Sequence, residues 1–171
     1  MLTVGNIDTP QLPVAKLAAA WAPLDALGPA KLPEPINNGP QHHYVTEAAL
    51  ARLNAWVAAG TPPPSAPRIE LQHVDAKGAT MGGIRTPWVD VPVSHLSGFP
   101  VTVMGPGAIA GSAIPYDQAA LARFYPGGKA EYLRQFQAAL DESIQSGFIL
   151  AADRNEILAL ARLSYPQNAP K

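Results

Sequence analysis

The chain has 171 residues, the size of a single domain that can bury a hydrophobic core. Its 12 basic and 13 acidic residues leave a formal net charge of -1 without any Lys/Arg cluster, so binding to DNA or RNA is not expected. The absence of cysteine excludes disulfides, thiolate catalysis and cysteine-based zinc sites. No apolar run is long enough to span a bilayer, so no membrane association is expected.

Charged residues make up 15% of the chain, against roughly 25% in typical soluble domains. This composition fits a piece of a larger protein, whose uncovered face would meet the missing part, and it equally fits an Ala- and Pro-rich protein. The N-terminus lacks the basic region and apolar run of a signal peptide. A cytoplasmic location is therefore expected if Met1 is the true start.

Nineteen prolines lie mostly between periodic segments and divide the chain into elements. Apolar residues at helical spacing predict a short helix over residues 13–21, and the aperiodic residues 23–40 predict an irregular loop. We expect a single unit with four parts. These are a loop-rich part with one short helix (1–45), a helix (46–60), an extended arm (66–115) and a helical closure (116–164).

The helix over residues 46–60 is predicted from its ends. Thr46 is a suitable N-cap, and Gly60 supplies a left-handed stop. Leu50, Leu53 and Val57 would share one face of this helix.

Two extended segments are expected in the arm. Alternation of side chains predicts a strand over residues 69–75, with a turn at Lys77 and Gly78. Residues 81–93 contain Pro87 and Pro92, which cannot donate a backbone hydrogen bond, so this stretch predicts an edge strand or a strand-like loop.

Three helices are predicted to close the chain. Asp117 is placed to cap a helix that ends at Tyr125, and a longer helix follows over residues 129–146. Gly147 would end that helix in a Schellman motif. Asp153 and Glu156 have the spacing of a capping box for the last helix.

No serine has the setting of a hydrolase nucleophile. Such a serine lies on a tight strand-to-helix elbow with the pattern G-x-S-x-G. Neither Ser97 nor Ser112 has both glycines. Ser94 and His95 are neighbours in an extended segment, so their side chains would point to opposite faces and could not act as nucleophile and base.

His42 and His43 are the candidate catalytic residues, because a loop before a helix can present an imidazole as a general base. The alternative is that one histidine packs or caps while the other faces solvent. Asn38 and Gln41 are candidate binding residues, and the alternative is that they satisfy backbone groups of the loop. Arg85 would bind a substrate carboxylate or donate to backbone carbonyls.

A metal site would have to combine distant residues. His42 or His43 would join ligands such as His73, Asp75, Asp90 or His95, and no compact ligand motif supports this combination. The expectation is therefore that no metal or other cofactor is bound.

Several stretches carry a resemblance to a known family. Residues 36–45, 53–64 and 82–93 read INNGPQHHYV, LNAWVAAGTPPP and GGIRTPWVDVPV, and the pairs Tyr116-Asp117 and Gly147-Phe148 follow. Together they resemble the C-terminal region of bacterial alpha/beta hydrolase domain-containing proteins, over nearly the whole chain from Ile36 onward.

The resemblance implies an α/β-hydrolase-like serine hydrolase fold that acts on esters or amides. It also implies that the nucleophile elbow lies upstream, so that this chain begins at an internal methionine and lacks catalysis by itself. The expected fold class is thus the helix-rich C-terminal part of an α/β fold, incomplete, with a few edge strands and long Pro-rich loops. His42, His43 and Gln41 would lie near the pocket.

Two functions follow as alternatives. The chain is either a portion of a serine hydrolase that acts with its missing N-terminal half, or a standalone binding or interaction module derived from that fold. An independently active enzyme that uses His42 or His43 with a metal is a third alternative. Expected partners are the missing half or a second copy, with a small ester as the substrate of the full-length protein.

Overall fold

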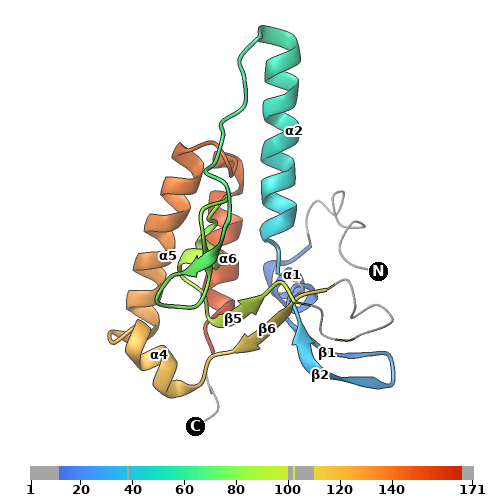
Figure 1. Cartoon of the computed structure of the whole chain (residues 1–171), viewed down its shortest axis with the longest axis vertical. Helices are drawn as coiled ribbons and strands as arrows, with labels where there is room; N and C mark the ends of the chain where they lie inside the picture. The colour runs from blue at the N-terminus through green and yellow to red at the C-terminus, as the bar shows by residue number, and fades with distance from the viewer. Residues whose placement is uncertain (1–11, 38, 100–101, 103–109, 167–171) are drawn as a thin grey trace.

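A computed structural model describes residues 12–37, 39–99, 102 and 110–166 (Figure 1). The α-helices are α1 (Val14–Ala20), α2 (Gln41–Ala59), α3 (Pro87–Asp90), α4 (Gln118–Phe124), α5 (Gly128–Gln145) and α6 (Arg154–Ser164). The strands are β1 (Leu24–Leu27), β2 (Ala30–Ile36), β3 (Glu70–Val74), β4 (Thr80–Met81), β5 (Ser94–Ser97) and β6 (Ser112–Pro115). Within the described residues, no helix combines the length and apolar character needed to cross a membrane.

The core lies where α5 packs against α6 and where α1 packs against α6. Tyr132, Phe136 and Leu140 on α5 are buried because they recur at helical spacing on one face. Ile157 and Leu160 on α6 are buried against that face. Each such aliphatic or aromatic side chain stabilises the fold by roughly 1.5–3 kcal/mol through burial.

The closing helices begin and end close to where the sequence predicted. The Asp117 side chain accepts a hydrogen bond from the Ala120 backbone N–H at 2.7 Å and so caps α4. At the end of α5, Gly147 has a φ of 81°, and the Phe148 N–H donates to Ser143 O at 3.0 Å, as in a Schellman motif. The predicted capping box at α6 is wrong, since Asp153 occupies the N-cap position but its side chain makes no capping hydrogen bond.

Helix α2 differs from the prediction at its start. It begins at Gln41, directly after Pro40, so Thr46 is inside the helix and is not its N-cap. Gly60 ends it in the left-handed conformation, with a φ of 70°, as predicted. Figure 1 shows that α2 projects beyond α5 and α6. Only Tyr44 and Ala48 of this helix are fully buried.

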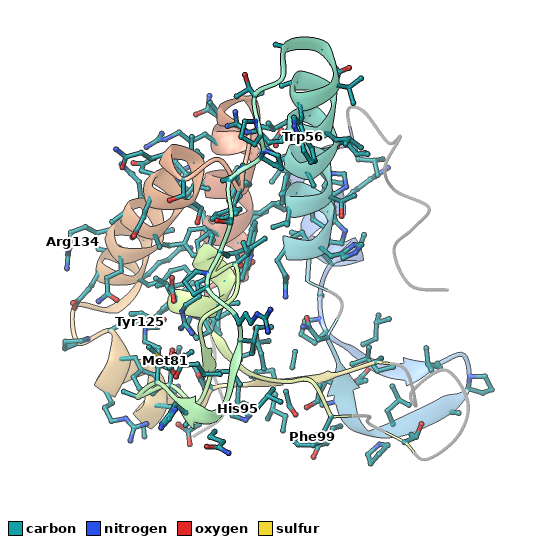
Figure 2. All side chains as sticks on the ribbon, turned by 45° about the horizontal axis from the view of Figure 1, so that its top comes forward. Trp56, Met81, His95, Phe99, Tyr125 and Arg134 are labelled. Atoms are coloured by element: carbon teal, nitrogen blue, oxygen red, sulfur yellow. The ribbon has the colours of Figure 1, made fainter. Side chains whose placement is uncertain are left out.

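The far half of α2 exposes apolar side chains. The exposed fractions of Leu50, Leu53, Trp56 and Val57 are 54%, 51%, 51% and 81%. Figure 2 shows Trp56 near the free end of the helix, remote from His95 and Phe99. The predicted common face of Leu50, Leu53 and Val57 therefore faces away from the core.

The predicted loop over residues 23–40 is wrong, because it contains a β-hairpin. Strands β1 and β2 pair antiparallel around Gly28, which has a φ of 60°. The hairpin accommodates Pro33 and Pro35 of β2 because neither lies at a registered pairing position. Strand β2 is in register with β6 at the pair Ile36 and Ser112.

A four-stranded antiparallel sheet results, in the order β1-β2-β6-β5. Strands β5 and β6 have continuous register, in which Leu96 pairs with Ala113 and Ser97 pairs with Ser112. Because successive side chains of a strand alternate between faces, Leu96 and Ala113 lie on one face of the sheet, and Ser97 and Ser112 lie on the other. The two faces of this sheet border two different cavities, which are described below.

The predicted strand over residues 69–75 is confirmed as β3, which pairs with the short β4 in a separate two-stranded sheet. Of the stretch 81–93, only Met81 is in a strand, and Pro87–Asp90 forms the short helix α3. The described chain is thus a mixed α/β structure with six α-helices and two small antiparallel sheets.

Candidate functional site

An apolar cavity of about 480 Å³ lies between the four-stranded sheet and the helices. Its floor is the face of β5 and β6 that carries Ser94, Leu96 and Ala113. Trp21, directly after α1, and Leu163 on α6 contribute to the walls. A volume of this size is within the range of small-molecule sites, which is roughly 300–1,000 Å³.

The described lining of this cavity contains no charged side chain. Its polar groups are neutral, and they include the side chains of Asn37, Gln41 and Ser94. The Trp21 Nε1 donor and the Gln41 Oε1 acceptor are buried and have no hydrogen-bond partner within the protein. Both atoms are covered by the protein in this conformation, so neither faces the open volume of the cavity, although buried polar atoms are normally hydrogen-bonded.

A second cavity of about 360 Å³ lies on the opposite face of the same sheet. Glu34, His95, Ser97 and Ser112 line it, together with the exposed ring of Phe99. Figure 2 shows His95 and Phe99 near this sheet. Ser94 lines the first cavity and His95 the second, which confirms the prediction that these neighbours point to opposite faces.

No hydrogen bond joins a serine hydroxyl to an imidazole within residues 12–37, 39–99, 102 and 110–166. The Ser97 hydroxyl accepts from the Phe99 backbone N–H at 3.2 Å. His95 lies against Gly78, where an added Cβ would be 3.0 Å from its Cε1 atom. The described residues therefore hold no assembled nucleophile and base.

The two candidate histidines lie in the first turn of α2 and not in a loop, contrary to the prediction. Pro40, and not Thr46, occupies the N-cap position of this helix. His42 is exposed. His43 is largely buried, and its Nε2 atom lies 3.4 Å from Glu47 Oε1.

The imidazole of His43 belongs to an aromatic cluster. Its ring centroid lies 5.5 Å from that of Trp21 and 5.0 Å from that of Tyr44. The Nδ1 atom is buried without a partner, so in this conformation it cannot reach a substrate. Neither His42 nor His43 lines the apolar cavity, and a catalytic role for either stays a prediction.

Carboxylates from two helices meet beside this cluster. The Tyr44 hydroxyl donates to Glu156 Oε1 at 2.7 Å, which ties α2 to α6. Burial, together with the nearby charges of Glu47 and Glu156, raises the pKa of Asp153 to about 6, and His43 opposes this shift. The Asp153 Oδ2 atom is buried and unpaired, so its charged form is poorly compensated. Burial and the contact with Glu156 also raise the pKa of Tyr44.

Arg85 is held by two carboxylates away from both cavities. Its Nη2 atom lies 2.5 Å from Asp75 Oδ2, and its Nε atom lies 2.5 Å from Asp90 Oδ1. Burial disfavours the charged guanidinium, but the hydrogen bonds to Asp90 and Asp75 outweigh this effect and raise the pKa of Arg85. The group fastens the turn after β3 to α3. Binding of a substrate carboxylate by Arg85 stays a prediction.

Of the remaining predicted residues, Gln41 lines the apolar cavity and Asn38 lies outside the described residues. No group of three His, Asp or Glu side chains with the geometry of a metal site is present in the described part of the chain. The sequence did not predict the cavity itself, because its walls come from six separate segments whose apolar residues have no motif. The one usable sequence signal was the alternation of side chains along β5, which places Ser94 and His95 on opposite faces.

A family model described as "Alpha/beta hydrolase domain" matches residues 6–159 of the chain. No curated protein and no solved structure gives a significant match. The match agrees with the resemblance noted from residues 36–45, 53–64 and 82–93, at the level of the family. Because the matched span takes in most of the sequence, the chain belongs to the alpha/beta hydrolase domain family.

Proposed function

We propose that this chain is the substrate-binding, C-terminal portion of a serine hydrolase that acts on esters or amides, and that it does not turn over substrate alone. Family membership supports the hydrolase class. The apolar cavity of about 480 Å³ is the observation that carries the proposal. It offers a place for the apolar group of a substrate.

The lack of turnover follows from the chemistry of acyl transfer. This reaction needs an oxygen nucleophile within hydrogen-bond reach of a base. The described residues offer no such pair, and His43 has its Nε2 atom beside Glu47 and its Nδ1 atom buried. The nucleophile would have to come from a segment with a G-x-S-x-G elbow, which this sequence lacks.

A second candidate is a standalone binding or interaction module. The observation in its favour is that residues of this one chain, from α1 to α6, suffice to form the walls of the cavity. The exposed apolar side chains of α2 give such a module a surface for a second copy or another protein.

Turnover is tested by incubating the full chain with p-nitrophenyl butyrate and following p-nitrophenol release. The expected result is a rate equal to that of buffer alone. Robust turnover that is lost in His43→Ala but retained in His73→Ala, a control for an exposed histidine, would refute the proposal.

The two candidates are separated by the coding sequence upstream of Met1. A continuous reading frame that contains a G-x-S-x-G elbow supports the hydrolase portion. A ribosome-binding site directly before Met1 supports the module.

A further inference from the structure

The apolar cavity has no charge with which to balance a charged ligand. None of its described lining residues is acidic, basic or histidine, and their polar side chains carry only amides, hydroxyls and indoles. Transfer of an ionised carboxylate or ammonium group into such surroundings is strongly unfavourable unless a counter-charge is present. A neutral ester carbonyl needs only one hydrogen-bond donor.

The volume gives the scale of the ligand. A protein cavity of roughly 150 Å³ holds one benzene molecule. The volume here is about 480 Å³, so there is room for a fused aromatic ring system or an acyl chain of comparable bulk. Because Leu163 is 53% exposed and also lines the cavity, it lies at the rim.

We infer that the cavity selects uncharged, apolar esters or amides and rejects the carboxylate that their hydrolysis produces. This inference rests on the proposed function. Hydrolysis of an ester adds water across the acyl C–O bond and gives an alcohol and a carboxylic acid. The acid loses its proton near neutral pH, because its pKa is about 4. The reaction thus turns a ligand that fits the cavity into one that does not, which favours release of the product.

The test compares two ligands with the same ring system. Binding of methyl 2-naphthoate and of 2-naphthoate to the full chain is measured by isothermal titration calorimetry at pH 8. The ester is expected to bind at least tenfold more tightly than the carboxylate.

A charge placed at the rim should change this preference. Leu163→Lys is expected to raise the affinity for 2-naphthoate at least fivefold and to leave the affinity for the ester within twofold. Leu53→Lys is the matched control, because Leu53 is 51% exposed on α2 and does not line the cavity. It should change neither affinity.

A substitution in the floor tests the location. Ala113→Phe is expected to weaken ester binding more than tenfold, and Ile114→Phe, one residue further along β6 on the opposite face, should not. Equal affinities for ester and carboxylate would overturn the inference and leave the proposed function standing. If neither ligand binds, the proposed function fails as well.

Discussion

The carboxylates beside Tyr44 give the sharpest prediction for stability. The pKa of Asp153 is about 6 in the folded chain, against 3.8 for the unperturbed group. A folded-state pKa above the unfolded value means that the folded chain holds the proton more tightly. This contribution to the free energy of unfolding is therefore complete below about pH 4 and is lost as the pH rises through 6.

Asp153→Asn keeps the shape and removes the charge. The pKa difference of about 2 units corresponds to roughly 3 kcal/mol as an upper limit. Solvent screening of this half-buried group reduces the value by about half. Loss of a negative charge at the start of α6 costs a further ~0.3–1 kcal/mol, because the helix dipole favours it there. The variant should thus be about 1 kcal/mol more stable than the wild type at pH 8.

Urea unfolding at pH 4 and pH 8, followed by tryptophan fluorescence, measures this effect. The advantage of Asp153→Asn should nearly vanish at pH 4. Asp141→Asn is the matched control with the opposite sign, because the hydrogen bond from Arg154 lowers the pKa of Asp141. That variant should be less stable than the wild type at pH 8. A destabilised Asp153→Asn at pH 8 would refute the reasoning.

Three further variants and one control test the fold by urea unfolding or sedimentation. Phe136→Ala removes a fully buried ring and should lower the free energy of unfolding by about 3–5 kcal/mol, and a loss below about 1 kcal/mol would contradict the assigned core. Gly60→Ala should lower the free energy of unfolding by about 1 kcal/mol, because the φ of 70° at Gly60 is left-handed, although no atom lies within 4 Å of the added Cβ. Gly98→Ala is the control, because Gly98 is also in open space but has no positive φ, and its free energy of unfolding should change little. Leu53→Glu should reduce any self-association seen in analytical ultracentrifugation without lowering the free energy of unfolding, because Leu53 is exposed on the projecting helix.

The helices that close the chain were predictable because their signals are local. The Asp117 cap and the Gly147 stop are each fixed by a few adjacent residues, and both have the predicted geometry. The start of α2 was not predictable in this way. Thr46 is a residue type that favours the N-cap position, but Pro40 occupies that position in the structure. Residue preferences alone do not decide between two acceptable starts within one turn or two.

The β1–β2 hairpin and the cavity depend on partners distant in sequence. Pro33 and Pro35 argue against a strand until the register shows that they fall between paired positions. The cavity brings Trp21, Leu96 and Leu163 together, and none of these has a recognisable motif. Of the described residues predicted for the site, only Gln41 lines the cavity. Nothing local marks a residue as cavity lining when its role is only to be apolar and close to others.

Because side chains alternate along β5 and β6, a single layer of backbone separates the apolar cavity from the polar one. A shift of pairing by one residue would place His95 where Leu96 now lies and would exchange the environments on its two sides. With the register kept, libraries that vary only Ser97 and Ser112 would reshape the polar compartment while the hydrocarbon-lined one stays intact. Each side of this thin wall can thus be engineered separately.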